Sequence, residues 1–362
     1  MKKVYVISAY GYIVKKANYG SLLQFYALAK VLTELGFDSY WIKYVQKDES
    51  LLKSICKKIY KYIFKHKEYK INNMLLNSFM DFIDENLKTT KMTYHTKKQI
   101  KNNPPIADYY ITGSDQVWGG TLEPNYLTFA KGKKISYAAS FGKRTISKDH
   151  LDTIKDWLRE MDCVSVREAS GIDICNEIGV ISTQVLDPTL LLKDSDYLQN
   201  ENCKEACVLV YLLNVNDLSD AKQDFINKIS KHYKINYKYI GGVSKIDNYI
   251  NEKDLLYLSP KDFISHYKNS KCIITNSFHG TVFSIIFHKQ FFVFLQKGQF
   301  ASQNERIVSL LKLLSLENRI VESEHDINPD LYETIDWDNV EQILKNEKAH
   351  SINFLKKSLD IE

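Results

Sequence analysis

Short apolar runs alternate with helical patterns along most of the chain. Residues 4–7 and 39–44 are short apolar runs typical of buried strands. Between them, residues 21–35 place apolar side chains on one helical face, namely Leu22, Tyr26, Ala29 and Leu32. The order strand, helix, strand favours a parallel sheet covered by helices.

The two ends of this first helix carry their own signals. Ser21 and Gln24 have the spacing of a capping box, which predicts that the helix begins at Ser21. Gly36 is typical of the residue that ends a helix, because glycine adopts the left-handed backbone conformation without strain.

Residues 48–103 interrupt the alternation and are dense in Lys, Tyr and Asn. Apolar residues recur there at helical spacing, at Leu52, Ile55, Ile59 and Ile63. Lysines lie between them, at Lys57, Lys58, Lys61 and Lys65. We expect a helical insertion with a basic, solvated outer face that packs on its domain. A patch that contacts a membrane surface is the alternative interpretation.

After the insertion, strands and helices alternate again up to the C-terminus. Further strands are predicted at residues 109–112, 135–138, 163–166, 184–186, 207–213, 237–240, 271–275 and 290–294. Ser259 and Pro260 are good first residues for a helix. A polar stretch, residues 193–205, separates two similar halves.

We therefore predict an α/β protein with two domains that face a cleft. The N-terminal domain covers residues 1–200 and includes the insertion, and the C-terminal domain covers residues 201–335. Residues 336–362 are predicted to form a terminal helix that packs back on the N-terminal domain. A chain of 362 residues is long enough for two such cores.

Composition narrows the classes of function. The net charge is +5, from 49 basic and 44 acidic residues, which is too small an excess to predict nucleic-acid binding but would help attract an anionic substrate. Among six cysteines, only Cys203 and Cys207 form a close pair, so no zinc site is predicted and a reducing compartment is favoured. No apolar run is long enough to span a bilayer, so we expect a cytoplasmic protein.

Ligands of open α/β sheets bind beyond the carboxyl ends of the strands, so polar residues that follow predicted strands are the candidates for a site. Asn18, Gly20 and Ser21 precede the first helix, where backbone N–H groups can hold an anion. A simple capped turn is the alternative. Gly-x-Gly-x-x-Gly and Walker sequences are absent, so dinucleotide and P-loop sites are not supported.

The residues after the strand 109–112 combine small polar side chains with an acid and an aromatic ring. They are Ser114, Asp115, Gln116 and Trp118. An acid can accept protons from sugar hydroxyls, and an aromatic face can stack on a sugar. A turn in which Asp115 caps a helix explains the same pattern equally well.

Two further clusters contain charged residues. Arg167 follows a predicted strand, and arginine is the preferred bidentate partner of carboxylate or phosphate. A surface pair with Glu168 is the alternative. Asp187 and Pro188 fit the cap and first residue of a helix, which we favour over a role for Asp187 in ligand binding.

The last cluster connects a strand to an apolar helix. His279 lies at the positive end of this helix, beside Asn276, Ser277 and Gly280. Gly280 would allow a ligand to approach the backbone closely. A lone histidine is usually structural, but its position after a strand favours a functional role here.

Taken in order, these segments resemble the polysaccharide pyruvyl transferase family. The resemblance covers nearly the whole chain and rests on NYGSLLQFYAL, GSDQVW, YAASFG, VSVRE, LDPTLLL and TNSFHGTVFSIIF, followed by residues 306–314 and IDWDNVEQIL. Each segment alone is weak, whereas their joint order and spacing are specific.

This resemblance implies two Rossmann-like domains in a GT-B-like architecture. It implies phosphoenolpyruvate as the pyruvate donor, without another cofactor or a metal, and a nucleotide- or lipid-linked sugar of a bacterial surface polysaccharide such as a capsule as acceptor. A lipid-linked acceptor would bring the enzyme to the inner face of the membrane.

The resemblance also implies roles for individual residues. Arg167 matches the arginine thought to hold the anionic groups of the donor, and His279 matches the proposed proton-transfer residue. We add Asp115 as the base or hydroxyl orienter, and the backbone amides around Asn276, Ser277 and Gly280 as phosphate contacts.

One position departs from the family pattern. Ser277 stands where related proteins often carry a basic residue, two positions before the histidine. Arg306, Lys289 or a lysine of the insertion could supply that charge. Two alternatives stay open: a GT-B glycosyltransferase that uses a nucleotide sugar, and a non-catalytic glycan-binding protein that kept the fold.

Overall fold

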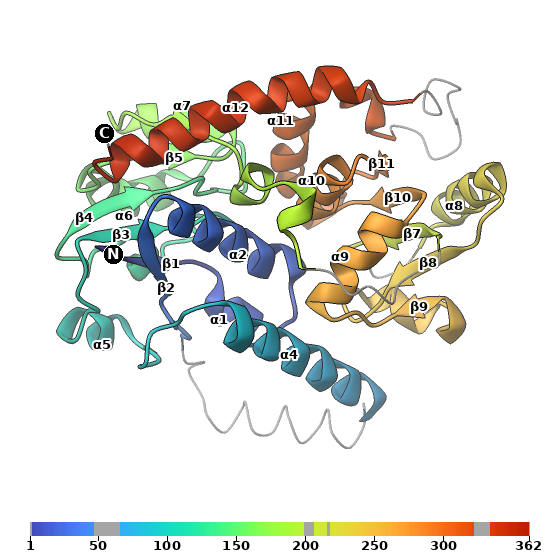
Figure 1. The fold of residues 1–362 in the computed structure, drawn as a ribbon, viewed down its shortest axis with the longest axis horizontal. Coiled ribbons are helices and arrows are strands. Elements are labelled where there is room, and N and C mark those ends of the chain that lie inside the picture. The colour runs from blue at the N-terminus through green and yellow to red at the C-terminus, as the bar shows by residue number, and fades with distance from the viewer. Residues whose placement is uncertain (1, 47–65, 199–205, 216–217, 322–333, 362) are drawn as a thin grey trace. The chain divides into compact units, whose positions relative to one another are not determined.

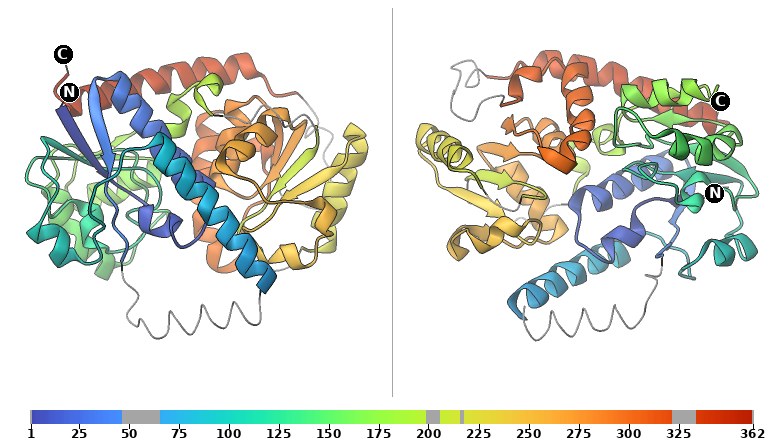
Figure 2. Two further views of the ribbon diagram at one scale, coloured as in Figure 1. Left: turned by 60° about the horizontal axis from the view of Figure 1, so that its bottom comes forward. Right: turned by 180° about the vertical axis from the view of Figure 1, so that it is seen from behind.

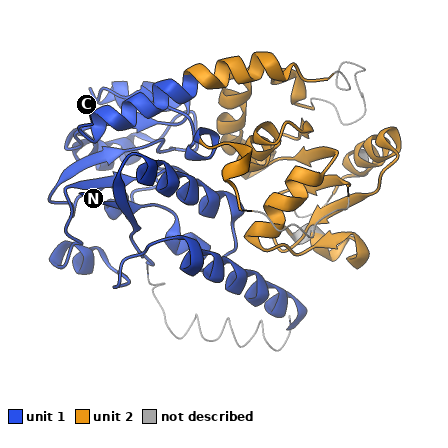
Figure 3. Ribbon diagram, in the orientation of Figure 1, with its two compact units in different colours: residues 1–191, 347–362 blue, residues 192–346 orange. Residues whose placement is uncertain are grey.

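The computed structural model describes residues 2–46, 66–198, 206–215, 218–321 and 334–361. The chain divides into two compact units (Figure 3). Unit 1 contains Met1–Leu191 and Glu347–Glu362, and unit 2 contains Leu192–Asn346. The boundary between them thus lies directly before the polar stretch 193–205, where the sequence predicts it. No helix among the described residues is both long enough and apolar enough to cross a membrane.

Unit 1 is built on a four-stranded parallel sheet with the order β2-β1-β3-β4 (Figure 1). Its strands are β1 (Lys2–Ile7), β2 (Phe37–Trp41), β3 (Tyr109–Thr112) and β4 (Lys133–Ser136). A short parallel pair, β5 (Ser165–Val166) and β6 (Thr183–Gln184), continues beyond β4 through isolated bridges. The helices are α1 (Tyr10–Ile13), α2 (Tyr19–Glu34), α4 (His66–Asn86), α5 (Lys97–Asn102), α6 (Lys148–Arg159) and α7 (Ala169–Glu177).

Unit 2 is built on a five-stranded parallel sheet with the order β11-β10-β7-β8-β9. Its strands are β7 (Val208–Tyr211), β8 (Tyr237–Ile240), β9 (Leu255–Leu256), β10 (Cys272–Thr275) and β11 (Gln290–Val293). The helices are α8 (Asp220–Tyr233), α9 (Pro260–Asn269), α10 (Phe278–Ile286) and α11 (Glu305–Leu313). The last helix, α12 (Trp337–Ser358), begins in unit 2 and ends in unit 1.

The strand orders fix where ligands can bind. In unit 1 the chain goes from β1 to β2 on one side and then to β3 on the other; in unit 2 it goes from β7 to β8 and β9 and then to β10 on the opposite side. Each sheet therefore has a topological switch point, between β1 and β3 and between β7 and β10. Ligands of open parallel sheets bind at the carboxyl ends of the strands at such points.

Every predicted strand overlaps an observed one, so the α/β prediction with parallel sheets is confirmed. The predicted start of the first helix was wrong. The helix begins at Tyr19, and its cap is Asn18, whose Oδ1 accepts the N–H of Ser21 at 2.9 Å. The end was right, because Gly36 has a φ of +88° directly after the last turn.

The predicted insertion is only partly visible, and residues 47–65, with its basic run, lie outside the described residues. Its described part belongs to unit 1. Helix α4 runs beside α2 in each view (Figures 1 and 2), and Phe79 and Phe82 contact Tyr19 and Tyr26 at ring-centroid distances of 5.0 and 5.5 Å. The chain after α4 then bridges to the segment around β2.

The C-terminal part of α12 is joined to unit 1 by a buried polar contact. Ser351 is fully buried, and its Oγ accepts the backbone N–H of Leu186 at 3.0 Å. The hydroxyl of Tyr137 donates to the carbonyl of the same Leu186 at 3.1 Å. Both polar groups of the Leu186 backbone are thus satisfied by side chains.

We expect Ser351→Ala to lower the free energy of unfolding by about 1–3 kcal/mol, because a buried N–H loses its acceptor. Urea denaturation of the full chain measures this. The matched control is His350→Ala, one residue earlier on the exposed side of the helix, which should change stability by less than about 0.5 kcal/mol. Equal effects of the two substitutions would contradict this view of the contact.

Candidate functional site

A buried arginine organises the carboxyl ends of the strands in unit 1. The guanidinium of Arg167 donates from Nη1 to Asp187 Oδ2 at 2.8 Å and from Nε to Glu168 Oε1 at 2.9 Å. The same Nη1 lies 3.3 Å from the hydroxyl oxygen of Ser114. All four residues are at most 5% exposed. The predicted Arg–Glu pair therefore exists, but it is buried rather than on the surface.

Asp187 is the second centre of this cluster. Its Oδ2 also accepts the hydroxyl of Ser114 at 2.8 Å, and its Oδ1 accepts the N–H and the hydroxyl of Thr189 at 3.0 and 2.6 Å. Asp187 thus caps the short 3-10 helix Pro188–Leu191, which confirms the structural interpretation of this residue. Its carboxylate joins the segments that follow β3, β5 and β6.

The carboxylates around Arg167 make this residue unsuitable as the main contact for the anionic groups of the donor. Burial by itself would lower the pKa of Arg167, but the carboxylates of Glu168, Asp187 and Asp115 outweigh it, and the pKa is raised. One permanent cation thus faces three carboxyl groups. An incoming phosphate or carboxylate would have to compete with two of them at hydrogen-bond distance. We therefore correct this assignment and expect Arg167 to position its neighbours.

Asp115 lies where the switch point of unit 1 is expected. Ser21, from the first turn of α2, donates its hydroxyl to Asp115 Oδ2, and the N–H of Gln116 donates to Oδ1 at 2.8 Å. Asp115 has a φ of +82°, an uncommon conformation for a residue other than glycine. It is partly exposed, whereas Ser21 is buried. The structure thus brings together two residues that the sequence placed in separate clusters.

The remaining predicted residues of unit 1 have smaller roles. Asn18 caps α2, and Gly20 is buried in the first turn, so the capped-turn interpretation holds for this segment. Ser114 is fully buried and committed to Asp187. Gln116 is partly exposed and lies against Gly142, where a φ of +66° and the Gln116 side chain leave no room for a Cβ atom.

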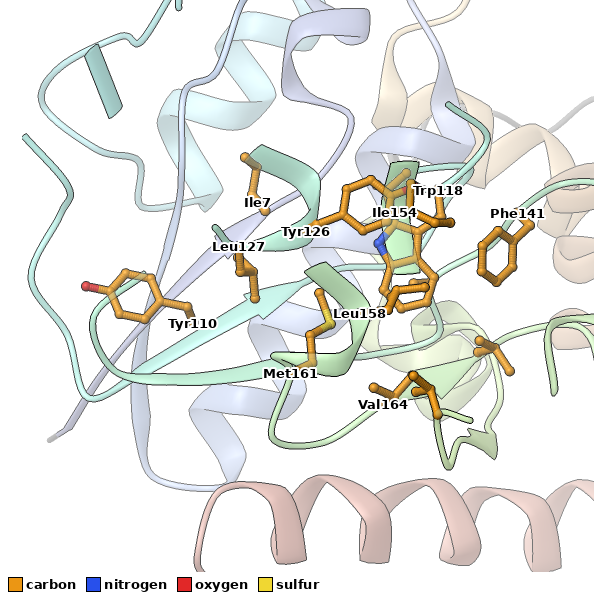
Figure 4. Close-up of a cluster of buried hydrophobic side chains, with 14 of the residues drawn as sticks. Ile7, Tyr110, Trp118, Tyr126, Leu127, Phe141, Ile154, Leu158, Met161 and Val164 are labelled. Carbon is orange, nitrogen blue, oxygen red and sulfur yellow. The ribbon is translucent and has the colours of Figure 1, made fainter. Parts of the chain in front are cut away.

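Trp118 does not provide a face for a sugar. It is fully buried in the core of unit 1, where it stacks on Tyr126 at a centroid distance of 5.8 Å and contacts Phe141 at 5.3 Å (Figure 4). Its indole N–H donates to the carbonyl of Asn125 at 3.2 Å. The prediction of a stacking residue at position 118 was wrong, because the side chain points into the core.

Sequence reasoning missed Tyr12. This residue lies in α1, shortly after β1, and is 49% exposed. Burial raises the pKa of Tyr12, and the negative charge of Asp115 raises it further. A tyrosine in an apolar pattern gives no signal of this kind, since its exposure depends on how α1 packs.

In unit 2, hydrogen bonds tie together the two strands that flank the switch point. The side chain of Asn276, after β10, donates to the carbonyl of Leu213 at 2.9 Å and accepts the N–H of Leu213 at 2.6 Å. The hydroxyl of Thr275 donates to the carbonyl of Tyr211 at 2.7 Å. The side chain of Asn276 is therefore structural.

The backbone amides predicted to hold phosphate are partly used within the turn itself. Ser277 caps α10, where its Oγ accepts the N–H of Gly280 at 3.3 Å, and its own N–H donates to Thr275 Oγ1 at 3.1 Å. A Cβ atom on Gly280 would lie 2.3 Å from Thr275 Oγ1 and 3.0 Å from the ring of Tyr211. Gly280 thus permits close packing of α10 on the sheet, not the approach of a ligand as predicted.

His279 is the second residue of α10 and lies at the carboxyl end of β10, as predicted. Its ring contacts Phe278 edge to face at a centroid distance of 5.1 Å, and the side chain is 6% exposed. Arg306, from the start of α11, lies 5.9 Å above the same Phe278 ring. Gln303 accepts hydrogen bonds from Arg306 Nη2 at 3.2 Å and Nε at 3.3 Å. The histidine and the arginine thus lie against the same aromatic ring.

The structure separates the cations that could replace a basic residue at position 277. Lys289 directly precedes β11, whose first residue pairs with the first residue of β10. Lys289 therefore lies at the amino end of the sheet, opposite His279. Of the lysines of the insertion, those at positions 57–65 lie outside the described residues, and the others belong to unit 1. Within unit 2, Arg306 rather than Lys289 lies near His279.

Comparison with known proteins identifies the family of the chain. The family model for polysaccharide pyruvyl transferase matches residues 18–297, a range that includes Asp115, Arg167 and His279. The chain belongs to the polysaccharide pyruvyl transferase family. No curated protein matches it in sequence at a significant level.

Solved structures are similar to this pyruvyl transferase family member at low sequence identity. The S. aureus MnaA–UDP complex has a TM-score of 0.51 at 13% identity and covers 100% of this chain and 98% of its own. A UDP-GlcNAc 2-epimerase from Methanocaldococcus jannaschii has a TM-score of 0.48 at 11% identity, with coverages of 95% and 99%. The likeness to the first structure confirms the GT-B-like fold class and says nothing more specific about the reaction.

We expect Arg167→Ala to destabilise the protein by about 3–5 kcal/mol, because Asp187 and Glu168 would stay buried without their cation. Urea denaturation tests this. Lys155→Ala removes an exposed pair with Asp152, with 3.1 Å between the charged atoms, and should cost less than about 1 kcal/mol. A small loss for Arg167→Ala, similar to that of the control, would show that the buried cluster does not hold this edge together.

Proposed function

We propose that this pyruvyl transferase family member moves pyruvate from phosphoenolpyruvate to two hydroxyls of one hexose, forming a cyclic ketal, during synthesis of a bacterial surface polysaccharide. Family membership supports pyruvylation of a polysaccharide in general. The observation that carries the specific proposal is that His279 and Arg306 both lie against the ring of Phe278, at the switch point of unit 2. A proton donor beside a fixed cation is what an anionic enol phosphate requires.

The reaction defines what the protein must supply. A proton is added to the methylene carbon of phosphoenolpyruvate, so that the central carbon becomes cation-like and bonds to the first hydroxyl oxygen. Phosphate then leaves with its bonding electrons, and the second hydroxyl oxygen bonds to the same carbon. Both hydroxyl protons are released, and the products are the ketal and inorganic phosphate. The scheme uses no cofactor besides the co-substrate.

We assign the donor to unit 2. His279 is the acid that protonates the methylene carbon, and the positive end of the α10 dipole favours an anion beside it. Arg306 binds the phosphate or carboxylate, and its position over Phe278 and its bonds to Gln303 reduce the entropy lost on binding. This arrangement supplies the charge that Ser277 lacks.

We assign the acceptor to unit 1. Asp115 orients a sugar hydroxyl and accepts its proton, and Gln116 is a further contact that is partly exposed. Arg167 positions this edge through Asp187 and Ser114. The acceptor is proposed to be nucleotide- or lipid-linked, and the protein to be cytoplasmic.

The proposed contact with the inner face of the membrane has its own test. Co-sedimentation with liposomes, with and without anionic lipid, would reveal a basic patch that binds the membrane. Equal, negligible binding to both kinds of liposome would remove this part of the proposal.

The function is tested by measuring phosphate release from phosphoenolpyruvate with a panel of nucleotide- and lipid-linked hexoses. The proposal predicts release that depends on both substrates. Release of nucleoside diphosphate from a nucleotide sugar would instead identify a glycosyltransferase. Sugar binding without turnover across the panel would favour a non-catalytic glycan-binding protein.

His279→Ala should lower kcat by roughly a hundredfold or more, the usual effect of losing an acid–base group. Steady-state kinetics with the acceptor found above measures it. His232→Ala, an exposed histidine of α8, is the control and should leave kcat unchanged. Turnover of His279→Ala at the level of the wild type would exclude His279 from proton transfer.

Arg306→Ala should raise the KM for phosphoenolpyruvate by roughly ten- to a hundredfold, the value expected for one hydrogen bond to a charged group. Arg306→Lys should have an intermediate effect, because lysine keeps the charge but loses the planar donors. Lys289→Ala, which removes a cation at the opposite end of the strands, should leave this KM unchanged. The reverse order of effects would assign the donor contact to Lys289.

A further inference from the structure

Tyr12 is held in an exposed position by a firmly packed helix. Its neighbours Tyr10 and Ile13 are 5% and 0% exposed, and the ring of Tyr10 packs edge-on against Trp41 at a centroid distance of 5.2 Å. A Cβ atom on Gly11 would lie only 2.6 Å from the carbonyl oxygen of Tyr44, so the backbone of α1 lies directly on that segment. The 49% exposure of Tyr12 is therefore a feature of ordered structure.

The topology of unit 1 brings Tyr12 and Asp115 to the same edge of the sheet. Ile7 at the end of β1 pairs with Thr112 at the end of β3, and Tyr12 and Asp115 lie in the segments that follow these two strands. Burial and the negative charge of Asp115 raise the pKa of Tyr12, so the phenol stays protonated at neutral pH. Tyr12 can therefore donate its own proton to an oxygen of a ligand.

Asp115 provides the complementary acceptor. Its carboxylate is fixed by Ser21 and by the N–H of Gln116, and each carboxylate oxygen can accept a second hydrogen bond. Its φ of +82° has a counterpart in Ala138, which has a φ of +52° and precedes the residue that bridges to Asp115. Left-handed residues at two neighbouring strand ends are typical of backbone shaped by a functional site.

These groups select a ligand by hydrogen bonding and shape. The carboxylate oxygens of Asp115 are acceptors, which favours a ligand that presents hydroxyl protons. A neutral sugar fits, because its hydroxyls both donate and accept hydrogen bonds while its C–H face packs on an aromatic ring. We propose that Tyr12 is the aromatic platform of the acceptor-sugar subsite, with Asp115 and the Tyr12 hydroxyl as its polar contacts.

This inference rests on the proposed function for the identity of the acceptor, and two substitutions separate the parts of the platform. Tyr12→Ala removes ring and hydroxyl and should raise the acceptor KM by roughly tenfold or more, since stacking contributes about 0.5–1.5 kcal/mol and the hydrogen bond a similar amount. Tyr12→Phe keeps the ring and should raise the acceptor KM by only about two- to tenfold. The KM for phosphoenolpyruvate should not change.

The control is Tyr249→Ala, which removes a tyrosine of unit 2 that is 72% exposed and should leave both KM values unchanged. Because Tyr12 is also exposed, Tyr12→Ala should stay folded, and the conservative Tyr12→Phe provides a second variant. An unchanged acceptor KM in Tyr12→Ala would overturn the proposal.

A binding experiment without phosphoenolpyruvate separates this inference from the proposed function. Saturation-transfer NMR with a set of methyl hexopyranosides should show sugar contacts in the wild-type chain that are lost in Tyr12→Ala and retained in Tyr249→Ala. This result would support the subsite even if no pyruvate transfer were found. Sugar binding that persists in Tyr12→Ala, or no binding of any hexoside to the wild type, would refute it.

Discussion

The buried ion pairs of Arg167 are the interaction on which the site of unit 1 depends. One guanidinium joins Glu168, Asp187 and Ser114, and Asp187 adds Thr189, so the segments after β3, β5 and β6 must assemble together. Burying such charges is costly unless every partner is present, which makes this edge of the sheet an all-or-none structure. Asp115 directly follows Ser114, and its position is therefore tied to this cluster.

In unit 2, neutral side chains join the carboxyl ends of the strands. Asn276 bonds both polar groups of the Leu213 backbone, and Thr275 bonds the carbonyl of Tyr211, so the ends of β7 and β10 are joined without buried charge. Gly280 lets α10 approach these residues closely. Near His279, the charged group over the ring of Phe278 is the cation of Arg306. The edge of the sheet in unit 1 is rich in carboxylates instead.

The sequence predicted the features that depend on local pattern. Strand positions, the end of the first helix at Gly36 and the cap at Asp187 follow from periodicity and backbone chemistry, and they were confirmed. Contacts between distant residues were not predictable in this way. Trp118 is predicted to stack on a sugar, but its side chain is buried. Arg167 is predicted to bind a ligand, because its partner Asp187 lies 20 positions away and the sequence does not show that they pair. The exposure of Tyr12 has no counterpart in the sequence pattern.

In the proposed reaction, the enzyme attaches pyruvate to a sugar through one ketal carbon. The most direct test is NMR of the product made from phosphoenolpyruvate labelled with 13C at its central carbon. The account predicts that the label becomes a quaternary carbon bonded to two oxygens of the same hexose, with couplings to protons on the two sugar carbons that carry these oxygens. Label found only in phosphoenolpyruvate or free pyruvate, while the sugar is consumed or bound, would contradict it.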